Sequence, residues 1–145
     1  MISHASFQEQ IIIALRDCAD LESLVADDEI RESQYQGTEF VYPNIRVDVR
    51  TQIPEGTSPC RLKHSIENFA VIATSENDSS LECEQICFQI IECLFGAQIE
   101  DATPSQGPNW RCETINLIQF NAPRRMAERI WRGEVIFRGR VKETS

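Results

Sequence analysis

Histidine is scarce in this chain of 145 residues, which contains two, His4 and His64. Nucleophilic catalysis at a serine, threonine or cysteine usually depends on a nearby base, most often a histidine held by a carboxylate. His4 lies near the N-terminus, and His64 shares the alternation of Leu62 and Ile66 in a predicted strand, where a packed or edge histidine is the simpler interpretation. Histidine-dependent catalysis is therefore not favoured.

Other motifs for catalysis or cofactor binding are also missing. The sequence has no glycine-rich phosphate loop, no His-Glu-x-x-His and no Gly-x-Ser-x-Gly. Carboxylates are abundant because the whole chain is acidic, so a pair of them is not a specific signal. There is no Cys-x-x-Cys pair, and two histidines are a weak basis for completing a zinc site. We expect no enzyme activity, no metal and no cofactor.

Long apolar runs are absent. The longest, at residues 11–15 and 69–73, are far shorter than the roughly 18–20 residues that a membrane span requires. No lysine or arginine precedes Arg16, so the N-terminus lacks the charge cluster of a signal peptide. We expect a protein made in the cytoplasm, with no membrane partner.

Cysteine is not scarce, but its distribution argues against a disulfide framework. Three of the six cysteines fall inside one predicted helix, where Cys83 and Cys87 share the apolar face and act as small hydrophobic residues. A reducing compartment also favours thiols. The sequence therefore predicts reduced cysteines. The six are Cys18, Cys60, Cys83, Cys87, Cys93 and Cys112.

Basic residues are few and unevenly placed. The chain has 14 Lys/Arg and 23 Asp/Glu, a net charge of −9. Residues 111–145 carry eight basic and four acidic side chains, net +4, whereas residues 1–110 carry six and nineteen, net −13. The overall negative charge repels nucleic acid phosphates at long range. We expect no dedicated DNA or RNA binder, although DNA can move past an acidic surface without adhering to it.

The hydrophobic pattern predicts a single domain over residues 1–145, with flexible termini and a mobile loop near 52–61. Apolar residues three and four apart predict helices that begin at capping boxes at Ser6 and Ser79, the second ending at Gly96. Alternation predicts the strands. Together these elements predict an α+β fold, with a mainly antiparallel or mixed sheet of about four strands covered on one face by two amphipathic helices. The predicted strands begin at Tyr42, run from Leu62 to Ala73 with a bulge near 67–68, and span roughly 110–120 and 128–141.

The last predicted strand has two different faces. Trp131, Val135 and Phe137 alternate with charged residues and can cover the helices. The opposite face presents a row of arginines with apolar neighbours, Arg132, Arg138 and Arg140. Arginine and aromatic residues are enriched at protein interfaces. This face is therefore a candidate for contact with another subunit.

Three further arginines, Arg124, Arg125 and Arg129, cluster near the predicted connection between the last two strands. They allow three interpretations: a solvated hairpin tip, a subunit contact, or a grip on a phosphate or carboxylate group. The turn-rich segment that includes Pro54, Glu55 and Gly56 is a candidate docking arm.

The order and length of these elements resemble a known family. An N-terminal amphipathic helix is followed by a strand opening with Tyr42-Pro43, a second strand running into a serine-capped helix (79–95), and a final strand at 131–137. This layout is similar to that of the tail terminator and tail completion (head–tail neck) proteins of long-tailed bacteriophages. The six cysteines and the long loop at 52–61 depart from the commoner members of that family.

The resemblance implies a structural virion protein, assembled in the host cytoplasm, that forms a homo-oligomeric, hexameric ring. The ring would cap the tail tube, end its polymerisation and join it to the neck or stopper (connector) protein of the head. Genome DNA would pass through its channel without sequence-specific binding. Two alternatives remain open: another neck or baseplate adaptor, or an acidic cytoplasmic binding or inhibitor protein.

Overall fold

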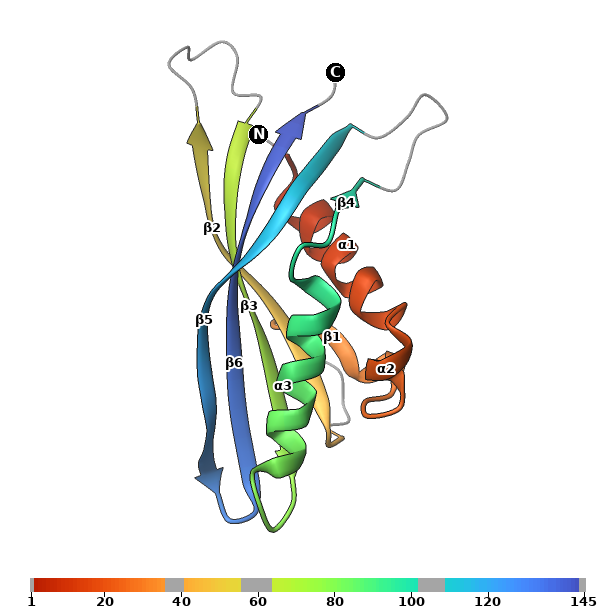
Figure 1. Ribbon diagram of the computed structural model, residues 1–145, viewed down its shortest axis with the longest axis vertical. Helices are drawn as coiled ribbons and strands as arrows, with labels where there is room; N and C mark the ends of the chain where they lie inside the picture. The colour runs from red at the N-terminus through yellow and green to blue at the C-terminus, as the bar shows by residue number, and fades with distance from the viewer. Residues whose placement is uncertain (1, 36–40, 56–63, 102–108, 144–145) are drawn as a thin grey trace.

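The computed structural model describes residues 2–35, 41–55, 64–101 and 109–143 (Figure 1). A twisted sheet forms one layer, and the helices form the other. The helices are α1 (His4–Arg16), α2 (Ala19–Glu22), a 3₁₀ turn (Asp27–Glu29) and α3 (Leu81–Leu94), and the strands are β1 (Ile30–Glu32), β2 (Asn44–Glu55), β3 (His64–Glu76), β4 (Ile99–Glu100), β5 (Trp110–Ala127) and β6 (Ile130–Glu143).

The sheet is mixed, and its strand order is β1-β2-β3-β6-β5-β4. Only β1 runs parallel to its neighbour, β2, and the other pairs are antiparallel. The α+β class and the mixed sheet are confirmed, but the described residues form six strands instead of about four. The additional strands, β1 and β4, lie between the elements that the sequence predicted.

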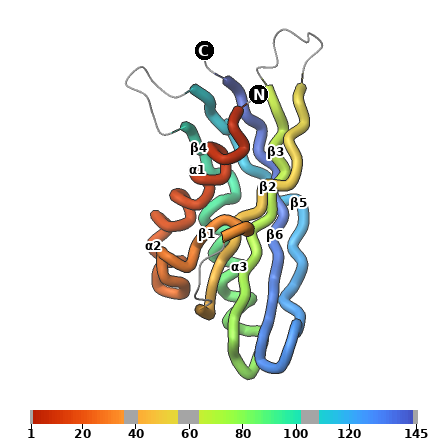
Figure 2. Tube along the Cα trace, turned by 180° about the vertical axis from the view of Figure 1, so that it is seen from behind, coloured from red at the N-terminus to blue at the C-terminus, as the bar shows by residue number. Residues whose placement is uncertain are grey.

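All the helices cover the same face of the sheet, as Figures 1 and 2 show from opposite sides. Residues of this face are largely buried along β3 and β6, and those of the other face are at least partly exposed, except Ala70, which is buried. Three phenylalanines meet at the centre of the core, where Phe69 contacts both Phe7 and Phe137. The opposite face of the sheet, which no described helix covers, is called the open face below.

Both long helices begin near the predicted residues, but not with the predicted caps. The side chain of Ser3, not Ser6, caps α1 by accepting a hydrogen bond from the Ser6 backbone N–H. The Ser6 hydroxyl instead donates to Asp101 and accepts from the Trp110 indole N–H. In α3 the cap residue is Ser80, whose side chain makes no capping hydrogen bond.

The end of α3 is confirmed. Gly96 has a φ of +75°, a left-handed conformation that glycine adopts without steric cost. Its backbone N–H donates to the Ile115 carbonyl of β5, which ties the end of the helix to the sheet.

The predicted bulge near 67–68 is wrong. Burial in β3 follows the odd positions without a break, because Ser65 and Glu67 occupy the core face and Ile66 the open face. The register shift lies instead in the partner strand, between Val49 and Thr51 of β2. The prediction failed because hydropathy places Ile66 in the core and Glu67 in solvent. In the structure Glu67 is buried and Ile66 is partly exposed.

The last two strands are longer than predicted. β5 has 18 residues and β6 has 14, and they join at a two-residue turn, Glu128-Arg129. Their pairing shifts register at four places, which absorb the extra residues of β5. Arg124 and Arg125 therefore belong to β5 and not to a connecting loop, while Arg129 lies in the turn with a φ of +64°.

The predicted mobile loop at 52–61 is also corrected. Gln52 to Glu55 continue β2 and pair with β3, so they are not part of a loop. The remainder, including Gly56, lies outside the described residues. The termini are ordered as far as they are described, since Ile2 is buried and Glu143 ends β6.

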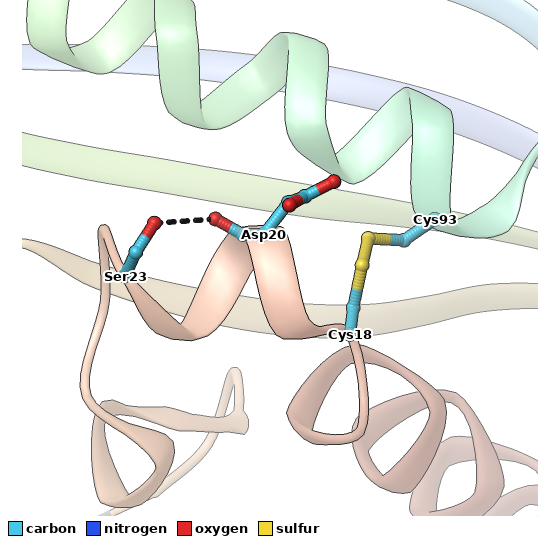
Figure 3. Close-up of a disulfide and its surroundings, with 4 residues drawn as sticks. All are labelled: Cys18, Asp20, Ser23 and Cys93. Atoms are coloured by element: carbon cyan, nitrogen blue, oxygen red, sulfur yellow. Dashed lines mark hydrogen bonds between the residues drawn. A yellow bond between two sulfur atoms is a disulfide. The ribbon is translucent and has the colours of Figure 1, made fainter.

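One pair of cysteines contradicts the prediction of reduced thiols. Cys18 and Cys93 form a disulfide that links the start of α2 to the last turn of α3 (Figure 3). They are 75 residues apart in sequence, and each belongs to a different amphipathic pattern, so spacing gave no sign of the bond. Beside it the Ser23 hydroxyl donates to the Asp20 carbonyl and tightens α2. Cys83, Cys87 and Cys112 are free and buried, in agreement with the prediction.

Candidate subunit interface

The open face places the predicted arginine row where a partner can reach it. Alternation directs Trp131, Val135 and Phe137 towards the helices and Arg132, Arg138 and Arg140 towards the open face. The sequence predicted this division, because a strand with one covered face needs a strict two-residue period. Four basic side chains and one acidic side chain of β6, Glu134, project on this face: the three arginines and Lys142.

The centre of the open face is apolar. Ala70 of β3 pairs in register with Ile136 of β6, and Ile72 of β3 projects from the same face two residues further along. Both isoleucines are partly exposed. Neighbouring rows carry the charges, so the open face consists of a small apolar centre with a charged border.

Ion pairs organise that border. Glu134 lies between two arginines, with its carboxylate 3.0 Å from Arg50 Nη1 and 3.6 Å from Arg132 Nη2. The hydrogen bond from Arg50 to Glu134 raises the pKa of Arg50. Arg138 Nε donates to the Asn68 side-chain oxygen across 3.1 Å. These contacts hold the arginine side chains over the sheet and fix where their positive charge lies.

Two candidates that are far apart in sequence meet on this face. Arg140 Nε lies 3.0 Å from Glu55 Oε2, although 85 residues separate them. Pro54 precedes Glu55 and pairs in register with Ser65, so it lies on the other side of the sheet from Glu55. Of the predicted docking segment, Glu55 therefore contacts the predicted arginine row.

The other three arginine candidates lie at the far end of the same hairpin and are exposed. Arg124 pairs in register with Arg132, so it extends the basic border onto β5. Arg129 forms an ion pair of 2.7 Å with Asp78, and its carbonyl accepts from the Asn77 N–H. Arg129 thus fastens the β5–β6 turn to the segment before α3, a structural role that accounts for its position.

Sequence reasoning missed the apolar side chains on the outer surface of α3. Leu81, Phe88 and Phe95 are 59%, 47% and 59% exposed. Their seven-residue spacing was a signal that could have found them, since it defines a line along one side of a helix. The buried apolar stripe on the opposite side of α3 has more members, and it drew attention away from this second line of apolar residues.

A buried carboxyl group was missed as well. Glu67 is fully buried, and its Oε1 accepts hydrogen bonds from Gln52 and Ser65, each at 3.0 Å. Its Oε2 has no hydrogen-bond partner among the described residues. Burial raises the pKa of Glu67 because it penalises the charged form.

The three free cysteines are packed in the core. Cys83 and Cys87 pack against Gly133 of β6, and burial raises the pKa of Cys112 to about 12. A thiol with so high a pKa is a poor nucleophile. Within the described ranges, no group of three or more His, Cys, Asp or Glu side chains is placed to hold a metal ion. No helix in those ranges is long and apolar enough to cross a membrane.

Comparison with known proteins adds a structural relative. No family model and no curated protein matches the chain. A solved chain from "Virion of native gene transfer agent (GTA) particle" has a similar fold, with a TM-score of 0.77 and 14% sequence identity. The match covers 97% of this chain and 99% of the other. At that identity the match establishes the fold, which the two chains share over nearly their whole length.

Proposed function

We propose that this protein is a structural component of a phage-like virion and that it acts as a tail terminator. The supporting observation is the end-to-end fold match with a chain from a gene transfer agent virion particle. The order of elements in the sequence, which resembles that of tail terminators, points to the same role. In this role the protein works by assembly and not by catalysis, and it takes no cofactor.

The proposed assembly is a hexameric ring of identical copies. A ring requires a heterologous contact, in which one patch of a subunit meets a different patch of the next. The open face supplies one patch, with Arg132, Arg138 and Arg140 at its border. Exposed ion pairs contribute only about 0–1 kcal/mol each, so these charges set register and partner choice more than affinity.

The ring would cap the tail tube and bind the neck or stopper protein on its other side, which places the protein in the virion at the head–tail junction. The net charge of −9 fits a channel through which DNA passes without being held. The exposed hairpin end with Arg124 and Arg125 is available to the tail tube or neck partner.

Electron cryomicroscopy of particles that contain the protein tests this role. We expect six copies in a ring at the end of the tail nearest the head. A ring at the baseplate would replace the terminator with an adaptor, and absence from the particle would refute a virion role altogether.

A further inference from the structure

The outer surface of α3 has features that its own subunit does not use. Leu81, Phe88 and Phe95 form an apolar ridge along the helix, called the α3 ridge below. Phe88 lies about 200° around the helix axis from Ile90, which is buried in the core. The ridge therefore points away from the core of its own subunit. Large apolar side chains that line up on a surface are typical of an interaction site.

The ridge follows the edge of the sheet. The ring of Phe88 lies 5.7 Å from that of Phe120 in β5, and the far end of the helix is tied to β5 at Ile115. Because Phe120 is partly buried on the core face, it supports Phe88 from one side and leaves its outer side free. The ridge is thus held in place and is not a set of loose surface side chains.

The charge of α3 has one sign. The helix contains three glutamates and neither lysine nor arginine. Glu84 and Glu92 lie one turn before and one turn after Phe88, on either side of the ridge. No ion pair among the described residues includes a glutamate of α3. The ridge is therefore apolar with an acidic border.

The open face is its complement in both respects. Its exposed centre, at Ile72 and Ile136, is apolar, and its border carries the basic Arg132 and Arg138, with the one acidic side chain of β6 on this face, Glu134, paired to Arg132 and Arg50. The lengths also agree. A 14-residue helix is about 21 Å long, and the seven residues from Arg132 to Arg138, which are six steps apart, span about 20 Å of strand.

We infer that the α3 ridge of one subunit docks on the open face of β3 and β6 in the next copy of the same chain. The contact would add a second helical layer to each sheet, supplied by the neighbouring subunit. Because the helices and the open face lie on opposite sides of the sheet, the contact is heterologous and repeats in one direction, which a ring requires. This inference rests on the proposed ring and names the two surfaces that build it.

A charge exchange between the two surfaces tests the inference. The variant E84K/E92K makes the ridge border basic, and R132E/R138E makes the border of the open face acidic. Each variant alone should stay at the mass of one chain in light scattering, because its own two surfaces repel each other. Mixed in equal amounts they should assemble, because each surface then meets its complement in an alternating ring. The control E9K/D17K changes the charge by the same amount, on α1 and at its C-cap, and should assemble like the wild type.

Cross-linking inside particles gives a second measurement that does not require assembly in solution. A photoreactive phenylalanine analogue in place of Phe88 should couple to β3 or β6 of another copy, and the same analogue in place of Ile13 should not. The inference fails if E84K/E92K assembles alone, if the mixture of folded variants stays monomeric while the wild type assembles, or if Phe88 couples elsewhere. The proposed ring would survive these results. It fails separately if the wild type neither assembles nor occurs in particles.

Discussion

Arg140 and Glu55 form an ion pair of 3.0 Å that crosses β3 on the open face of the sheet. The side chains are 62% and 33% exposed, so solvent screens much of their attraction. The pair should therefore add little to the stability of the fold. It should also affect assembly, because Glu55 neutralises the charge of Arg140, which the next subunit would meet.

The change E55Q separates these two effects. The free energy of unfolding should change by less than about 1 kcal/mol, as expected for an exposed pair. Ring assembly should strengthen at low salt, because Arg140 becomes available to an acidic partner surface. Urea unfolding and light scattering measure the two effects, and weaker assembly of E55Q would show that Arg140 does not face a partner.

The disulfide between Cys18 and Cys93 should contribute strongly to stability. It closes a loop of 75 residues, and restricting the unfolded chain in this way is worth about 4 kcal/mol. The double variant C18S/C93S should lose that amount in denaturant unfolding, and reductant should destabilise the wild type equally. Reductant should have no effect on the double variant. If reductant leaves the unfolding free energy of the wild type unchanged, the disulfide does not form in solution.

Gly133 is required because α3 approaches β6 closely. A Cβ at this position would lie 2.6 Å from Cys87 Sγ and 3.3 Å from Pro123 Cγ. We expect G133A to lower the free energy of unfolding by about 1–3 kcal/mol through overpacking. Removing the sulfur should relieve the clash, so G133A/C87A should be more stable than the sum of the single variants predicts. Strict additivity would argue against the close approach.

Glu67 should make stability depend on pH. Burial raises its folded-state pKa above the unfolded value of about 4.3, so the folded protein holds the proton more tightly. Its contribution is complete below the unfolded pKa and is lost as pH rises through the folded pKa. The hydrogen bonds that Glu67 accepts from Gln52 and Ser65 oppose this shift.

The variant E67Q keeps an oxygen for Gln52 and Ser65 but cannot ionise. Between about pH 5 and about pH 8, the wild type should lose more unfolding free energy than E67Q does. Urea unfolding at a series of pH values measures the difference. Parallel curves for the two proteins would show that Glu67 titrates alike in the folded and unfolded chains.

The sequence predicts much of this fold where periodicity extends over many residues. The long helices, the core face of β6 and the arginine row follow from apolar spacing alone. β1 and β4 have three and two residues, too few to show any pattern. The course of β5 was also unpredictable, since each of its four register shifts reverses the alternation on which a strand prediction depends.

The candidate site was predictable in part for the same reason. Alternation places Arg132, Arg138 and Arg140 on one face, but sequence distance conceals the pairing of Arg140 with Glu55. A bulge was wrongly predicted near Glu67 because hydropathy does not anticipate a hydrogen-bonded carboxyl group in a core. The α3 ridge can be interpreted as a docking surface only when the structure shows that no described helix covers the opposite face of the sheet.

Tail length in particles assembled without this protein tests the central proposal most directly. If the protein ends tube polymerisation, particles from a genome with a stop codon early in its gene should show tails of irregular, excessive length that are not joined to heads. A supplied copy of the wild-type chain should restore uniform, attached tails. Attached tails of normal length in the absence of the protein would contradict the account.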